Sequence, residues 1–223
     1  MSDLRLVIFD VDGTLVDSQA DITQSMAAGF AAAGQETPAR EVILGVVGLS
    51  LPLAVARLAP DLDPATQGVI AEGYKRHYQH LRASQVAPVL YPGTLAMIEA
   101  LHAEPETLLG VATGKSRRGL DALMDQLGLR DRFLTLQCAD DHPSKPHPSM
   151  LHAAMAEGGI TDSARAVIIG DTSFDMEMGR AAGIRPIGVS WGYHDRGALG
   201  AAEAILDDWA ELPGVLSGIW GQA

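Results

Sequence analysis

The sequence predicts an α/β protein with a doubly wound, mostly parallel sheet (a Rossmann-like core) and an inserted helical cap domain. Short apolar segments alternate with segments of helical periodicity, which is typical of βαβ units. Acidic or hydroxyl residues follow several apolar segments directly, as expected where parallel strands end at a ligand site. Residues 18–85 contain no convincing strand, so the alternation is interrupted once.

Six short apolar segments are expected to form the strands. They are residues 5–9, 108–113, 133–138, 166–170, 186–190 and 204–206. Almost continuously apolar strands suit a parallel sheet that is covered on both faces. Helical segments such as 116–127 and 148–157 lie between them, so right-handed crossovers are expected.

The interruption is expected to be a helical insert. Ile22, Met26 and Phe30 are spaced four apart, and Gly34 follows as a plausible helix end. We therefore assign residues 1–17 and 86–223 to the core and residues 18–85 to the cap. An insert that leaves the sheet after its first strand can lie over the strand ends and act as a lid.

Composition narrows the function. Of the 223 residues, 47% are hydrophobic and 20% are charged, the balance of a soluble globular protein. The net charge of −12 disfavours nucleic acid and anionic membranes as partners, and no apolar run is long enough to span a bilayer. The single cysteine, Cys138, permits no internal disulfide, so we expect a cytoplasmic protein. The oligomeric state is left open.

The first chemical motif is Asp10-Val11-Asp12-Gly13-Thr14, directly after the first strand. A turn at Gly13 lets the chain bend, so that both carboxylates can face one pocket in different roles. We expect one to be a nucleophile and the other a proton carrier. Gly13 and Thr14 are expected beside the bound phosphate.

The second motif is Gly170-Asp171-Thr172-Ser173-Phe174-Asp175, again directly after an apolar strand. Asp171 stands at the strand tip, and Asp175 lies in the first turn of the next helix. Mg²⁺ prefers oxygen ligands and usually takes one or two carboxylates together with water and substrate phosphate. Asp10 and Asp171 could supply these carboxylates, with Asp175 as a further ligand or as support.

Two further segments suit phosphate binding. The Thr113 hydroxyl and the Gly114 amide stand at a strand end before a helix, where they could bind phosphate oxygens. Gly114-Lys115-Ser116 is not a P-loop, because Leu109 occupies the position that requires glycine. Lys145 precedes Pro146 in a loop and could be a fixed cation for phosphate and the crowded carboxylates.

These motifs, in this order, resemble the haloacid dehalogenase superfamily of phosphohydrolases, whose members include proteins with a helical cap after the first motif. The residues that carry the resemblance are Asp10-x-Asp12-Gly13-Thr14, Thr113, Lys145 and Gly170-Asp171-x₃-Asp175. Lys145-Pro146-x-Pro148, residues 170–183 and Trp191-Gly192-Tyr193 look most like the phosphoglycolate phosphatase branch.

The resemblance implies a role for each motif. Asp10 would form an aspartyl-phosphate, while Asp12 would protonate the leaving alcohol and then deprotonate water. Thr113 and Lys145 would hold the phosphoryl group. Mg²⁺ would be bound by Asp10, the backbone carbonyl of Asp12 and Asp171, with Asp175 in support. Leu49 and Ser50 match a cap segment that lies near substrate in the resembled branch.

Three functions remain open at this point. The favoured one is Mg²⁺-dependent hydrolysis of a small phosphate monoester such as phosphoglycolate. A second is phosphoryl transfer within a sugar, as in the related β-phosphoglucomutases, which share the motifs. A third is a non-enzymatic phospho-accepting receiver, although receivers are shorter and lack the insert and the Asp-Gly-Thr sequence.

Overall fold

A computed structural model describes residues 4–83 and 87–221 of the chain. Its centre is a six-stranded sheet in the order β3-β2-β1-β4-β5-β6, with every neighbouring pair parallel. The strands are β1 (Arg5–Phe9), β2 (Thr107–Thr113), β3 (Thr135–Cys138), β4 (Ala166–Gly170), β5 (Arg185–Val189) and β6 (Ala204–Leu206). The predicted fold class is confirmed. β3 begins two residues later than predicted, because the 3₁₀ turn η1 (Arg130–Arg132) precedes it.

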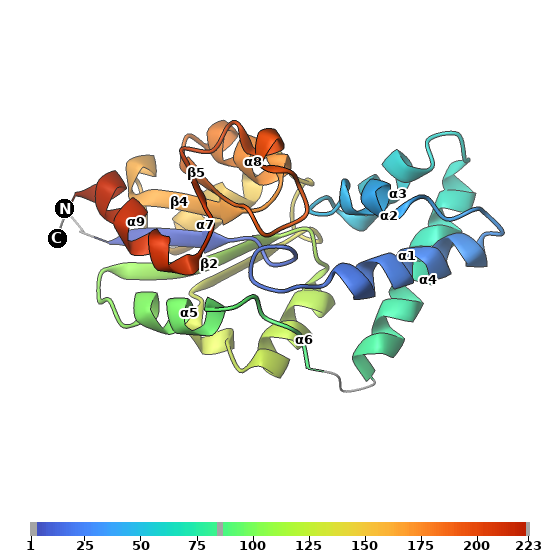
Figure 1. The fold of residues 1–223 in the computed structure, drawn as a ribbon, viewed down its shortest axis with the longest axis horizontal. Helices are drawn as coiled ribbons and strands as arrows, with labels where there is room; N and C mark the ends of the chain where they lie inside the picture. The colour runs from blue at the N-terminus through green and yellow to red at the C-terminus, as the bar shows by residue number, and fades with distance from the viewer. Residues whose placement is uncertain (1–3, 84–86, 222–223) are drawn as a thin grey trace.

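Helices cover both faces of this sheet, as the almost continuously apolar strands require (Figure 1). The core helices are α5 (Thr94–His102), α6 (Arg117–Leu127), α7 (Ser149–Glu157), α8 (Ser173–Ala182) and α9 (Leu212–Trp220). β1 shows how the faces are divided. Val7 and Phe9 pack with α5, α6 and α9, whereas Leu6 and Ile8 pack with α7 and α8.

The strand order places a topological switch point between β1 and β4. From β1 the chain first builds β2 and β3 on one side and then returns to build β4, β5 and β6 on the other. Phe9 pairs in register with Ile169, and the Asp10 N–H donates to the Ile169 carbonyl at 2.9 Å. The residues that follow these two strands therefore meet at the crevice where open α/β sheets bind ligands.

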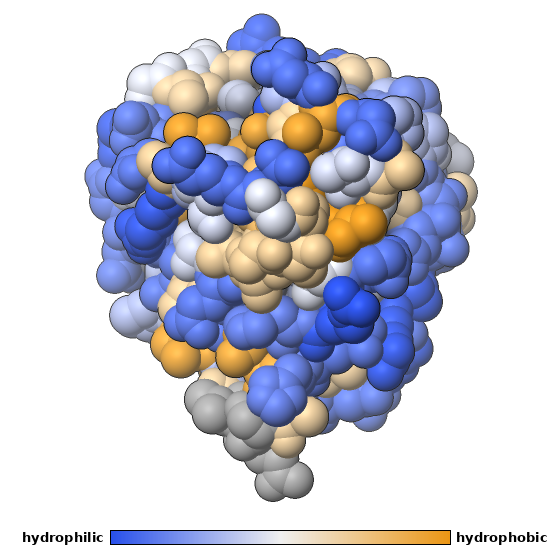
Figure 2. All heavy atoms as spheres, turned by 90° about the vertical axis from the view of Figure 1, so that its right-hand side faces the viewer, coloured by the Kyte–Doolittle hydropathy of each residue, from blue (hydrophilic) through white to orange (hydrophobic). Residues whose placement is uncertain are grey.

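Between β1 and α5 the chain forms four helices that make up the cap. They are α1 (Gln19–Ala32), α2 (Arg40–Leu44), α3 (Leu51–Leu58) and α4 (Pro64–Ala83). The cap lies beyond the carboxyl ends of the strands (Figure 1) and has its own apolar cluster, which includes Ile22, Phe30, Val55 and Ile70. On its outer face hydrophilic residues surround smaller hydrophobic patches (Figure 2).

The two connections between core and cap lie side by side. The Asp17 N–H donates to the Val89 carbonyl at 2.8 Å, and the Tyr91 N–H donates to the Leu15 carbonyl at 3.0 Å. One predicted boundary, 17/18, falls just before α1, and the other, 85/86, lies outside the described residues. The division at these positions stays a prediction. No helix among the described residues is both long and apolar enough to cross a membrane.

Helices α1 and α4 approach each other through two glycines. A Cβ on Gly73 would lie 2.8 Å from the Gly29 Cα, and a Cβ on Gly29 would lie 2.5 Å from the Ile70 carbonyl oxygen. Real Cβ atoms do not come so close to backbone atoms, so a side chain at either position would push the helices apart. The pair of glycines therefore sets the spacing of the cap.

Gly73→Ala is accordingly expected to lower the free energy of unfolding by about 1–3 kcal/mol, the usual cost of overpacking. Gly68→Ala is the matched control on the same helix, because a Cβ there meets nothing within 4 Å. The control should gain up to about 1 kcal/mol from helix propensity. Urea unfolding of both variants checks this, and equal shifts would contradict the packing argument.

Candidate active site

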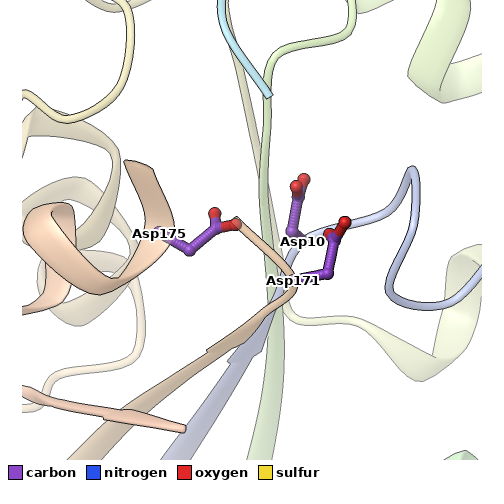
Figure 3. Close-up of side chains that lie close together, drawn as sticks. All are labelled: Asp10, Asp171 and Asp175. Atoms are coloured by element: carbon purple, nitrogen blue, oxygen red, sulfur yellow. The ribbon is translucent and has the colours of Figure 1, made fainter. Parts of the chain in front are cut away.

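Three buried carboxylates meet at the switch point. Asp10 follows β1, Asp171 follows β4, and Asp175 lies in the first turn of α8. One oxygen from each lies within 4.8 Å of the others. Figure 3 shows Asp10 and Asp171 side by side at the strand ends, with Asp175 pointing toward them from its helix. The structure thus brings together the acids of both predicted motifs.

A capping box holds Asp175 in place. Its carboxylate Oδ2 accepts the Thr172 N–H at 3.1 Å and the Thr172 hydroxyl at 2.7 Å, while Thr172 caps the start of α8. The other oxygen, Oδ1, accepts a hydrogen bond from Lys145 Nζ at 2.7 Å. Both oxygens of Asp175 are therefore engaged within the protein.

Lys145 is the counter-ion of the cluster. It is fully buried, and its Nζ lies 2.9 Å from Asp10 Oδ1 in addition to the contact with Asp175. Burial works against the charged ammonium, but the charges of Asp10 and Asp175 outweigh it and raise the pKa of Lys145. The lysine is thus a fixed cation.

Asp171 is fixed by the first motif and by a loop near β5. Its Oδ1 accepts the Thr14 hydroxyl at 2.9 Å, and its Oδ2 accepts the Tyr193 N–H at 2.8 Å. Gly13, at φ +85°, and Gly192 pack so closely on this side chain that a Cβ on either would overlap with it. Gly13 and Thr14 thus lie against Asp171, and their predicted contact with phosphate stays a prediction.

The cluster carries more negative than positive charge. Burial, opposed by Lys145 and reinforced by Asp175, raises the pKa of Asp10 to about 7. Burial and the charges of Asp10 and Asp175 raise the pKa of Asp171 well above its usual value. Neither oxygen of Asp10 accepts a hydrogen bond of ordinary geometry. Such an excess of buried carboxylate oxygens fits a hard divalent cation.

Asp12 has a different set of partners. Lys115 Nζ lies 2.8 Å from its Oδ1, which also accepts a hydrogen bond from the Ser18 hydroxyl. Lys115 Nζ in turn donates to Tyr78 of the cap at 3.1 Å, and the Ser18 hydroxyl lies 3.0 Å from that of Tyr193. The two acids of the first motif therefore have separate surroundings, which suits the different roles predicted for them.

The sequence motifs do not single out Lys115, Tyr78, Tyr193 or Ser18 as site residues. Lys115 stands two residues after Thr113, a position that could have drawn attention to it. Tyr193 belongs to the Trp191-Gly192-Tyr193 sequence that carries part of the resemblance, whereas Tyr78, in cap helix α4, has no comparable signal. Only the packing of the cap against the core brings Tyr78 to Lys115.

A cavity of about 330 Å³ lies between cap and core. Its wall includes the predicted residues Asp10, Asp12, Thr113, Gly114, Leu49 and Ser50. Lys145, Asp171 and Asp175 are buried behind this wall. A Cβ on Gly114 would lie 2.6 Å from the Gly48 carbonyl oxygen, so the cap segment lies directly on the end of β2. The volume is at the small end of the range for ligand pockets, which fits a small metabolite.

A doubly wound sheet, a carboxylate–lysine centre at its switch point and a helical cap define a class of α/β enzymes. The family model "Haloacid dehalogenase-like hydrolase" matches residues 7–189 of the chain. The chain therefore belongs to the haloacid dehalogenase-like hydrolase family, and the alternative of a non-enzymatic receiver is wrong.

Relatives agree on the class of enzyme. The N-acetylmuramic acid 6-phosphate phosphatase of Pseudomonas aeruginosa is 34% identical, and the match covers 96% of this chain and 95% of that protein. The phosphoglycolate phosphatase of Pseudomonas fluorescens is 32% identical, and the match covers 95% of this chain and 80% of that protein. A haloacid dehalogenase-like hydrolase from Streptococcus pneumoniae shares the fold, with a TM-score of 0.83, 24% identity and coverage of 97% and 100%. The chain is thus an enzyme of the phosphatase class.

Removing one buried charge should stabilise the protein when no divalent ion is present. In a chelator at pH 7, Asp171→Asn is expected to raise the free energy of unfolding by about 1–2 kcal/mol, a typical single-residue effect. The pKa of Asp171 is raised in the folded state, so the native protein binds a proton that the unfolded chain does not. The destabilisation that Asp171 causes therefore decreases as the pH falls. The gain should therefore shrink between pH 7 and pH 5.

Urea titrations at both pH values measure this effect. Asp131→Asn is the matched control, because Asp131 is exposed and should change the free energy of unfolding little. A gain for Asp171→Asn that grows toward pH 5 would contradict the charge argument.

Proposed function

We propose that the enzyme hydrolyses a small phosphate monoester through an aspartyl-phosphate on Asp10, with Mg²⁺ as cofactor. The observation that carries this proposal is the position of Asp10. It lines the cavity, and neither of its oxygens accepts a hydrogen bond of ordinary geometry. Its Oδ2 has no recorded hydrogen-bond or ion-pair partner among the described residues and can attack a phosphorus atom, while Oδ1 keeps its ion pair with Lys145.

Asp10, Asp171 and the backbone carbonyl of Asp12 are the proposed Mg²⁺ ligands. Asp175 is assigned to support, because Lys145 and Thr172 already engage its two oxygens. When bound, the ion would offset the negative charge of the site and of the phosphate dianion. Lys145 remains the fixed cation beside Asp10.

Asp12 is the proposed proton carrier. Its contacts with Lys115 and Ser18 hold its carboxylate at the cavity wall, where it can protonate the leaving alcohol and later take a proton from water. Thr113 and Gly114 line the same cavity at the end of β2 and are the proposed contacts of the phosphoryl oxygens.

The substrate is proposed to be a small phosphorylated acid of the phosphoglycolate type. The cavity is small, and both relatives described above are named for phosphates of acids. Leu49 and Ser50 of the cap line it and are proposed to select the substrate. The proposed division of labour leaves chemistry to the core and selection to the cap, residues 18–85.

Asp10→Asn is expected to abolish turnover with little loss of stability, because the amide has nearly the same shape but is a poor nucleophile. Asp12→Asn removes the proton carrier of both half-reactions, and such a group usually contributes about 10²–10⁴-fold. It should retain more of phosphoenzyme formation than of phosphoenzyme hydrolysis, so that phosphoprotein accumulates. Intact-mass measurement after mixing with substrate detects it.

Peptide mapping identifies the labelled residue, and a label at any residue other than Asp10 would overturn the assignment. Release of inorganic phosphate is followed in parallel. Conversion of glucose 1-phosphate to glucose 6-phosphate without phosphate release would instead favour the mutase alternative.

Magnesium should stabilise the fold as well as support turnover. A ligand that binds only the native state at 100 times its Kd adds about 2.7 kcal/mol, so the wild type should melt at a higher temperature in Mg²⁺ than in chelator. Asp171→Asn should lose most of this shift. Full phosphatase activity after exhaustive chelation, or an equal shift in the variant, would contradict the metal assignment.

A further inference from the structure

Two arginines line the cavity, one from the cap and one from the core. Arg82 belongs to the last turn of α4 in the cap, and Arg118 belongs to the first turn of α6 in the core. Figure 1 shows the end of α4 descending beside α6. Arg82 Nη1 would lie 3.8 Å from a Cβ placed on Gly119, so its guanidinium lies directly over that first turn.

The other cations of the cavity wall already have anionic partners. Lys115 is paired with Asp12 at 2.8 Å, and Lys75 is paired with Glu72 at 2.7 Å. Among the described residues, the structure records no ion pair or hydrogen bond for the side chains of Arg82 and Arg118. The wall therefore holds two guanidinium groups without a recorded ion-pair partner, that of the half-buried Arg82 and that of the exposed Arg118.

Arg82 shows most clearly that a partner is missing. Its Nη2 atom is shielded from solvent and has no hydrogen-bond acceptor. A buried donor without an acceptor is costly, and it is more so when it carries charge. Such a group is expected where a ligand completes the hydrogen bonding. Its place in the cavity wall gives that ligand access.

We propose that Arg82 and Arg118 bind a second anionic group of the substrate, a carboxylate or a second phosphate. This inference rests on the proposed function, in which a first phosphate reacts at Asp10. A guanidinium presents a planar fork of donors that matches both anions. Arg82 belongs to the cap and Arg118 to the core, so an anion held by both would also hold the cap against the core.

The test compares esters that differ only in this group. Phosphoglycolate carries a carboxylate where 2-hydroxyethyl phosphate carries a neutral CH₂OH, and ethylene glycol bisphosphate carries a second phosphate. The wild type should show a kcat/KM at least about 10-fold higher for one or both of the esters with a second anionic group than for the neutral one. The ester with the higher kcat/KM shows whether the second anionic group is a carboxylate or a phosphate.

Variants then assign this selectivity to the arginines. Arg82→Met and Arg118→Met should each lower the ratio of kcat/KM for the anionic over the neutral ester by about 10- to 100-fold, the range for a hydrogen bond to a charged group. Arg82→Lys keeps the charge without the fork and should lower it less. Arg76→Met is the matched control, since Arg76 is exposed on α4 outside this cavity.

The outcomes separate the two proposals. If the wild type releases phosphate from none of the esters, the proposed function fails. If it hydrolyses the anionic and neutral esters equally well, only the present inference fails. Equal losses on both esters in Arg82→Met, with a lower melting temperature, would assign Arg82 to structure and overturn the inference as well.

Discussion

The burial of Lys145 between Asp10 and Asp175 is the interaction on which the rest of the site depends. Burying a carboxylate is costly, and burying three close together is possible only if positive charge is supplied nearby. The ammonium supplies part of it, through contacts of 2.9 and 2.7 Å. Those contacts join the end of β1, the loop after β3 and the start of α8, so the same interaction that compensates the charge also fixes three elements around the switch point.

One ammonium does not neutralise three carboxylates. The negative charge that remains suits the site to a divalent cation and, through that cation, to phosphate chemistry. The raised pKa values of Asp10 and Asp171 show that the metal-free site resists holding all its negative charge. A divalent cation would relieve that resistance, and a phosphate dianion could then approach an acidic protein. The crowding of carboxylates that raises these pKa values is thus the same property that suits the site to a divalent cation.

The cap contributes to the site in two physically different ways. Tyr78 reaches Lys115, which holds Asp12, so the cap supports the proposed proton carrier. Arg82 instead lines the cavity with a buried Nη2 that has no hydrogen-bond acceptor, and this atom is the basis of the proposed anion subsite. Both depend on how closely α1 and α4 pack, which Gly29 and Gly73 set. The spacing of α1 and α4 therefore affects where Tyr78 and Arg82, near the end of α4, lie at the site.

The sequence by itself determined the fold class, the approximate positions of the strands and the acids that meet at the switch point. Apolar strands followed directly by acids are a local pattern, and parallel strands deliver their ends to one edge of the sheet. Asp10, Asp171 and Asp175 were therefore predictable as a cluster. Only the tertiary structure decided that Lys145 joins Asp10 to Asp175, that Thr14 binds Asp171 rather than lining the cavity, and that Lys115, Tyr78 and Arg82 lie at the site. These are contacts between the cap and the core or between distant loops, and no local spacing encodes which side chains such surfaces bring together.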